Sequence, residues 1–160
     1  MKRKGPKLTT KSILALESAI DAAVPQDYLC FLHATNGGSA SGLIFSVPGK
    51  KGTRYINDFL AASQSIRGPL AILDVRKQCT EFIPKDALPI AFVSGDDLLL
   101  LRTRPPKRFG AIDLKINSDV TNHDDPESGV VRVAKSFEAF MTMVKQVPEE
   151  ELDDDDYGMW

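Results

Sequence analysis

The sequence of 160 residues predicts an α+β fold, in which two N-terminal helices and a C-terminal helix flank a mostly antiparallel sheet. Apolar residues recur at helical spacing near both ends of the chain, which is typical of amphipathic helices. Between the ends, short apolar runs alternate with turn residues, as in neighbouring strands. The turn at Ser94–Asp97 separates two such runs and indicates a hairpin, so the strands that it joins are expected to be antiparallel.

Two helices are expected in the N-terminal quarter of the chain. The first covers about residues 10–22 with Thr9 or Thr10 as its cap, and Pro25 suits the first turn of the second, where a missing N–H costs nothing. Asn36-Gly37-Gly38 ends the second helix, because glycine readily adopts the left-handed conformation. The stripes expected to face the core are Ile13, Leu16, Ile20 and Val24 in the first helix, and Tyr28, Phe31, Leu32 and Thr35 in the second.

The sheet is expected in the middle of the chain. Residues 54–60 fit either a strand or a short helix, and residues 70–79 fit a short helix. Residues 98–103 contain an unbroken apolar run, which is typical of a central strand covered on both faces. Alternation of apolar and charged residues over 112–116 indicates a half-buried antiparallel strand. The remaining strands are expected at 43–47, 89–93 and 130–134, and Ser136 caps a final helix with Phe137, Phe140, Met141 and Val144 on one stripe.

Length and composition are those of a soluble globular domain. With 42% hydrophobic and 26% charged residues, the chain needs neither disulfides nor a metal to form its core. No apolar run approaches the roughly 20 residues that span a bilayer, and no apolar signal core follows the basic start, so we expect neither a membrane-spanning nor an exported protein. Cys30 and Cys79 lie among apolar residues and are expected to be buried in a protein of the reducing cytoplasm.

Charge divides the chain into a basic arm at residues 1–7, a domain at residues 8–148 and an acidic tail at residues 149–160. The segment Glu149–Asp156 holds seven of the 22 acidic residues, and the arm holds four of the 20 basic ones. The domain between them is nearly neutral, whereas a nucleic-acid-binding domain would carry a basic stripe. We therefore expect no direct binding of nucleic acid.

Several segments, taken in order, resemble a known family. They are Val24-Pro25, Asp27-Tyr28, Phe31-Leu32 and Asn36-Gly37-Gly38, then Ile83-Pro84 with Leu88–Phe92, the Gly95-Asp96-Asp97 turn, and Val131–Phe140. Together they extend over most of residues 8–147, and the chain resembles the SUKH superfamily, which groups fungal cell-wall synthesis regulators with bacterial immunity proteins of toxin systems. Members often have a Trp followed by His-Asp in the late strand and loop, whereas His123-Asp124 has no Trp nearby.

The resemblance implies a cytoplasmic immunity protein that binds a cognate bacterial toxin, expected to be a nuclease, and neutralises it by stoichiometric occlusion. The alternative is an intracellular regulatory or scaffold domain that binds a host protein and has no toxin partner. An enzyme is disfavoured, because the sequence contains no complete catalytic motif.

No motif for a metal, cofactor or nucleophile is complete. The Pro48–Thr53 segment lacks the spacing of a phosphate-binding loop. Cys30, His33, Cys79 and His123 offer a tetrahedral zinc set, but the second pair lacks the spacing of a zinc motif. A Cys30 nucleophile would require an exposed, electropositive site. We therefore expect no catalytic residue, no metal and no cofactor.

Partner contacts are expected in acidic segments. The polar loop at 117–129 gathers oxygen-bearing side chains, and loops on a rigid sheet often carry recognition residues, although a solvated loop is the alternative. The tail is either a disordered, solubilising extension or a docking segment that uses its terminal aromatic residues. The run Arg102–Arg108 lacks interleaved aromatic residues and is interpreted as a hairpin tip kept soluble by charge. The candidate partner-binding residues are Asp96, Asp97, His123, Asp124, Asp125, Glu127, Asp153, Asp154, Asp155, Asp156, Tyr157 and Trp160.

Overall fold

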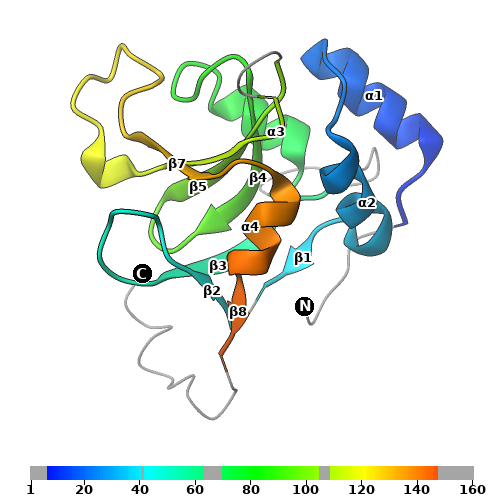
Figure 1. Cartoon of the computed structure of the whole chain (residues 1–160). Helices are drawn as coiled ribbons and strands as arrows, with labels where there is room; N and C mark the ends of the chain where they lie inside the picture. The colour runs from blue at the N-terminus through cyan, green and yellow to red at the C-terminus, as the bar shows by residue number, and fades with distance from the viewer. Residues whose placement is uncertain (1–6, 41, 63–69, 105–108, 148–160) are drawn as a thin grey trace.

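The computed structural model describes residues 7–40, 42–62, 70–104 and 109–147 (Figure 1). The helices are α1 (Thr10–Ile20), α2 (Gln26–Thr35), α3 (Ile72–Gln78) and α4 (Phe137–Met143), with a 3-10 turn η1 (Asn117–Asp119). The strands are β1 (Gly38–Ser39), β2 (Leu43–Phe45), β3 (Arg54–Phe59), β4 (Ala87–Val93), β5 (Asp97–Arg102), β6 (Ile112–Lys115), β7 (Val130–Ala134) and β8 (Lys145–Gln146). This combination confirms the predicted α+β fold.

The described strands form one curled antiparallel sheet in the order β7-β6-β5-β4-β3-β2-β8, and β1 pairs with β3. β4 and β5 form the expected hairpin, in which Val93 lies opposite Asp97. Every residue of β5 is buried, as expected for an interior strand with both faces covered. The ambiguous segment after residue 53 is a strand, β3, because β2 and β4 pair with its two edges.

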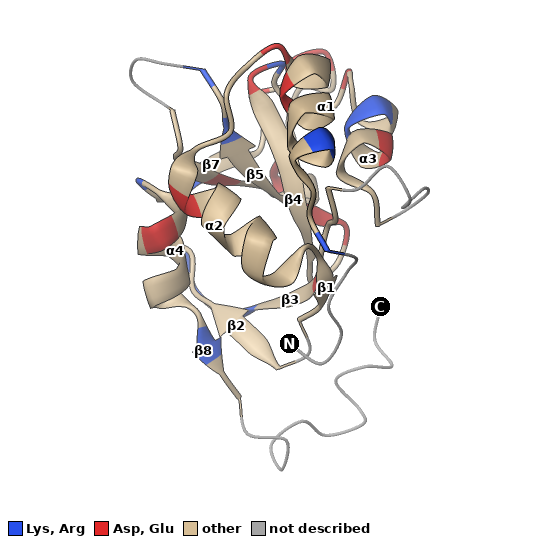
Figure 2. Cartoon of the chain, turned by 90° about the vertical axis from the view of Figure 1, so that its right-hand side faces the viewer, with Lys and Arg blue, Asp and Glu red and all other residues tan. Residues whose placement is uncertain are grey.

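One face of the sheet packs against α2 and α4, which lie side by side in Figure 1 and Figure 2. Directly opposed residues of antiparallel strands share a face, so the register places four apolar residues here: Phe59, Ala91, Leu99 and Leu114. The Phe31 ring centroid lies 4.8 Å from that of Phe59 and 4.9 Å from that of Phe137. Tyr28 and Leu32 are fully buried and Phe31 packs against the core, which confirms the predicted stripe.

The ends of the N-terminal helices follow from local chemistry. Thr9 is the cap of α1, since its hydroxyl accepts a hydrogen bond of 3.1 Å from the backbone N–H of Ser12. α1 ends before the expected residue 22, because Asp21 adopts a left-handed conformation with φ of 52°. In α2, the Asp27 carboxylate accepts a hydrogen bond of 3.0 Å from the backbone N–H of Glu138. This contact joins α2 to the first turn of α4.

The prediction that both cysteines are buried was wrong. Cys30 is exposed on α2, and Cys79 is only partly buried. Cys30 lies two positions from Tyr28 and from Leu32, and residues at that spacing do not share a helix face. Its apolar neighbours in the sequence therefore did not indicate burial.

The second face of the sheet carries buried charged residues, which corrects the prediction of a half-buried strand at 112–116. Leu100 lies opposite Asp113, and Leu98 opposite Lys115, so these two charged residues share a face with Arg102. Arg102 and Lys115 are each 1% exposed, and Asp113 is 2% exposed. The alternation of β6 is real, but the face that was expected to be open is covered by the chain around Phe82 and Asp86 and by residues 126–128.

No helix in the described ranges is long and apolar enough to cross a membrane. Residues 1–6 of the basic arm and the acidic tail at 149–160 lie outside the described residues, and so do the tail candidates Asp153, Asp154, Asp155, Asp156, Tyr157 and Trp160.

Candidate functional site

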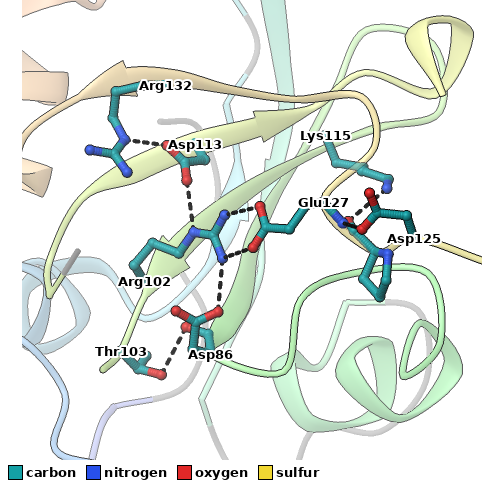
Figure 3. Close-up of polar contacts among 9 residues, drawn as sticks. Asp86, Arg102, Thr103, Asp113, Lys115, Asp125, Glu127 and Arg132 are labelled. Carbon is teal, nitrogen blue, oxygen red and sulfur yellow. Dashed lines mark hydrogen bonds and ion pairs between the residues drawn. The ribbon is translucent and has the colours of Figure 1, made fainter. Parts of the chain in front are cut away.

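The buried side chain of Arg102 lies at the centre of an ionic cluster on the second face of the sheet (Figure 3). Its Nε donates to Asp113 Oδ2 at 2.7 Å, and its Nη1 donates to Asp86 Oδ1 at 2.8 Å. The two terminal nitrogens also bind the two oxygens of Glu127, at 3.0 and 2.7 Å. Arg132 contacts the other oxygen of Asp113. We call these five residues the Arg102 cluster.

Hydrogen bonding keeps the Arg102 guanidinium charged despite its burial. Burial by itself lowers the pKa of Arg102, but the hydrogen bonds to Glu127 and Asp113 outweigh it and raise the pKa above the ordinary value. Asp86 precedes β4, Asp113 belongs to β6, and Glu127 belongs to the segment between β6 and β7. The guanidinium therefore joins three separate parts of the chain.

Lys115 holds the same connecting segment from a neighbouring position. Its ammonium donates to the backbone oxygen of Pro126 at 2.9 Å and to that of Ser128, and it lies 4.6 Å from the centre of the Phe82 ring. Burial lowers the pKa of Lys115, and nearby Asp125 and Glu127 partly oppose this shift. We call residues 117–129 the β6–β7 loop.

The β6–β7 loop is also ordered by its own polar groups. The Ser128 hydroxyl accepts hydrogen bonds from the backbone N–H groups of Thr121 and Asn122, at 2.8 and 3.1 Å. The Asn122 side-chain oxygen accepts from the N–H of Asp124, and the Asp125 carboxylate accepts from that of Glu127, each at 3.0 Å. These local bonds are typical of Asn, Asp and Ser in turns. These bonds order the backbone of the loop, and residues 121–125 at its tip are exposed.

The turn between β4 and β5 lies beside the start of this loop. The Asp97 side chain is 8% exposed, and its two oxygens accept hydrogen bonds of 2.9 Å from Arg54 and from the backbone N–H of Asn117. Burial raises the pKa of Asp97, whereas the hydrogen bond from Asn117 and the charge of Arg54 lower it. An ion pair of 2.7 Å between Asp119 and Lys50 joins the 3-10 turn η1 to the connection between β2 and β3. The ends of three connections thus meet at one end of the sheet.

Comparison with known proteins decides the family. Residues 7–143 match the SMI1 / KNR4 family (SUKH-1), which is most of the chain. This chain belongs to the SMI1 / KNR4 family. The SMI1 / KNR4 family is not a known enzyme family. Among curated proteins, none matched the chain.

The SUKH-1 fold gives the sequence-predicted site residues two different positions. Asp96, His123, Asp124 and Asp125 are exposed, and we call them the acidic surface. Asp97 is buried and binds Arg54, whereas Glu127 is partly exposed but binds the buried Arg102, so both carboxylates are engaged in ion pairs with the domain itself. Asp97 contacts Asn117 at the start of the β6–β7 loop, so the turn and the loop are neighbours; the structure gives no direct contact between Asp96 and the loop tip.

Sequence reasoning missed Arg102, Asp113 and Lys115 as supporting residues of the SUKH-1 domain. The interpretation of Arg102 as part of a soluble hairpin tip was wrong, because its side chain is buried against three carboxylates; Arg104 is exposed, and residues 105–108 lie outside the described residues. One signal was available, since an Arg directly after an apolar run must find acidic partners if that run is central. In the described part of the chain, no group of three or more His, Cys, Asp and Glu residues is arranged to hold a metal.

Proposed function

We propose that this SUKH-1 protein is an immunity protein that binds a cognate bacterial toxin in the cytoplasm and blocks it by covering its active site. Membership of the family supports the proposal, because the SUKH superfamily includes immunity proteins of toxin systems. The observation that carries it is the acidic surface, in which His123, Asp124 and Asp125 stand on a loop held from beneath by Arg102 and Lys115. The proposed toxin is a nuclease, and the proposed mechanism requires no metal, cofactor or catalytic residue.

The physical argument concerns charge and order. A nuclease binds a polyanion in a basic cleft, so acidic side chains on its inhibitor are attracted to that cleft and accelerate association. A loop that is already ordered loses little conformational entropy when it binds. The acidic surface combines both properties. In the same proposal, the tail residues at 153–157 and Trp160 extend the attraction beyond the domain.

The alternative proposal is a regulatory or scaffold domain that binds a host protein and has no toxin partner. Membership of the family also supports this alternative, because the SUKH superfamily includes fungal cell-wall synthesis regulators as well as immunity proteins. The same acidic surface would serve such a partner. The two proposals differ in one respect: an immunity protein protects a cell from a specific toxin, whereas a scaffold does not.

A test begins with the gene next to the one that encodes this chain. If that gene encodes a toxin, its toxin domain is expressed in a bacterial host with and without this protein, and growth is measured. We expect growth to be restored and the two chains to elute together as a stoichiometric complex. A neighbouring toxin that still kills in the presence of the folded protein, and that does not bind it, would contradict the immunity proposal.

A further inference from the structure

We infer that Arg102 and Lys115 are positioning residues that hold the β6–β7 loop in one conformation, as a unit that opens without unfolding the sheet. The inference rests on the proposed function for what the outer side of the loop contacts, but not for how the loop is held. Both residues belong to the sheet, and both are buried, so neither reaches a partner directly.

Arg102 and Lys115 hold the loop at adjacent points and by different groups. Arg102 binds the side chain of Glu127 with two parallel hydrogen bonds, which is the strongest geometry for a guanidinium and a carboxylate. Lys115 binds backbone oxygens on either side of Glu127, those of Pro126 and Ser128. Three consecutive loop residues are therefore fixed to the sheet, and the exposed residues 122–125 immediately precede them.

The contacts of the Arg102 cluster explain why the loop can open separately. If Glu127 leaves, Arg102 still has Asp113 and Asp86 as partners, at 2.7 and 2.8 Å. Glu127 itself is 44% exposed, so its carboxylate is hydrated when it leaves. Breaking a buried ion pair is costly when it leaves a buried charge without a partner. Neither Arg102 nor Glu127 is left in that state here. Opening the loop therefore costs the Glu127 contact and the two Lys115 hydrogen bonds, whereas the bonds of Arg102 to Asp113 and Asp86 remain.

Loop amides provide the measurement. The N–H groups of Thr121, Asn122, Asp124 and Glu127 donate to side chains of the loop, and that of Ile116 donates to the backbone oxygen of Gly129 at 2.9 Å, so their hydrogen exchange reports the order of the loop and of its ends. Exchange is followed by mass spectrometry on the full chain, and rates are expressed relative to the intrinsic rate of each sequence. In Glu127→Ala we expect exchange of these amides to accelerate about tenfold or more, with β4 and β5 unchanged.

Two further variants separate charge from shape. Glu127→Gln keeps the size and one acceptor oxygen of the side chain, and its loop exchange should lie between those of Glu127→Ala and the unaltered protein. Asp124→Asn removes the same charge three residues away, where the exposed carboxylate makes no hydrogen bond or ion pair with a described residue, and it should not accelerate loop exchange. Equal acceleration in Asp124→Asn and Glu127→Gln would overturn the inference, because loop charge alone would then explain the effect.

The role of Lys115 is tested in the same way with Lys115→Met, which should also accelerate exchange of the loop but not of β4 and β5. Unchanged loop exchange in both Glu127→Ala and Lys115→Met would overturn the inference, and so would equal acceleration in the loop and in β5. These measurements need no partner. The exchange measurements therefore test the inference even if the immunity proposal is wrong. If the inference is wrong, the growth experiment still tests toxin binding.

Discussion

At the scale of single residues, Tyr28 is a core residue whose ring packs well but whose polar hydroxyl is buried without a hydrogen bond from the described residues. Its ring is fully buried, with its centroid 5.1 Å from that of Phe137, and its hydroxyl has no hydrogen-bond partner among the described residues. Burial raises the pKa of Tyr28, so the hydroxyl stays protonated. We expect Tyr28→Phe to leave the free energy of unfolding unchanged or to raise it by about 1–3 kcal/mol. A loss above about 1 kcal/mol in denaturant unfolding would contradict this, since it would mean that the hydroxyl has a partner.

Lys115 makes a prediction about pH. Its pKa is lower in the folded protein than the ordinary value of 10.5, so between these two values the unfolded chain binds more protons at this residue. The stability contributed by Lys115 therefore rises with pH in that window. We expect the free energy of unfolding of the natural protein to rise relative to that of Lys115→Met as the pH rises through this window toward 10.5. A difference independent of pH would mean that the Lys115 ammonium is not desolvated.

At the scale of elements, the sequence predicted what depends on neighbours along the chain. The helical stripe of α2, the cap of α1 and the β4–β5 hairpin all follow from local spacing and turn chemistry, and the structure has them. β6 shows the limit of such reasoning. Alternation identified the strand, but whether Asp113 and Lys115 face solvent depends on segments that return from elsewhere in the chain, and no local pattern contains that information.

The candidate site divides along the same line. Loop composition correctly located a polar loop at 117–129, and the polar residues 121–125 are exposed there. The support beneath it, Arg102 and Lys115, could not be found from spacing, because Glu127 lies 25 residues from Arg102 in the sequence. Pairing of charges across that separation becomes visible only once the order of the strands is known.

Gly129 lies at the end of the β6–β7 loop, where the chain closely approaches Ile116, the residue after β6. With φ of 78°, a Cβ atom at this position would lie 2.7 Å from the backbone oxygen of Ile116. Gly95 has the same φ of 78°, but no atom lies within 4 Å of a Cβ there. We expect Gly129→Ala to lower the free energy of unfolding by more than about 1 kcal/mol, and by more than Gly95→Ala. Equal losses in thermal unfolding would show that backbone conformation alone sets the cost.

At the scale of the whole molecule, the acidic tail and the acidic surface are proposed to act on the same step of binding. Charges at the edge of an interface act mainly on association, and their effect is screened beyond about 10 Å at 0.1 M salt. Deleting residues 149–160 should slow association with the toxin and flatten its dependence on salt, while dissociation stays nearly unchanged. If Trp160 instead docks as an anchor, Trp160→Ala should accelerate dissociation. An unchanged salt dependence after deletion would remove the tail from the proposal.

The central claim is that the acidic surface contacts the partner, and association kinetics of charge-reversed variants test it most directly. Asp96→Lys combined with Asp124→Lys reverses two exposed carboxylates of the acidic surface without touching the Arg102 cluster. Glu138→Lys reverses an exposed carboxylate on α4, which packs on the other face of the sheet, and serves as the control. With the toxin of the neighbouring gene, we expect the double variant to associate at least about tenfold more slowly at low salt and Glu138→Lys to remain close to the natural protein. Equal association rates for the natural protein and the double variant would contradict the account.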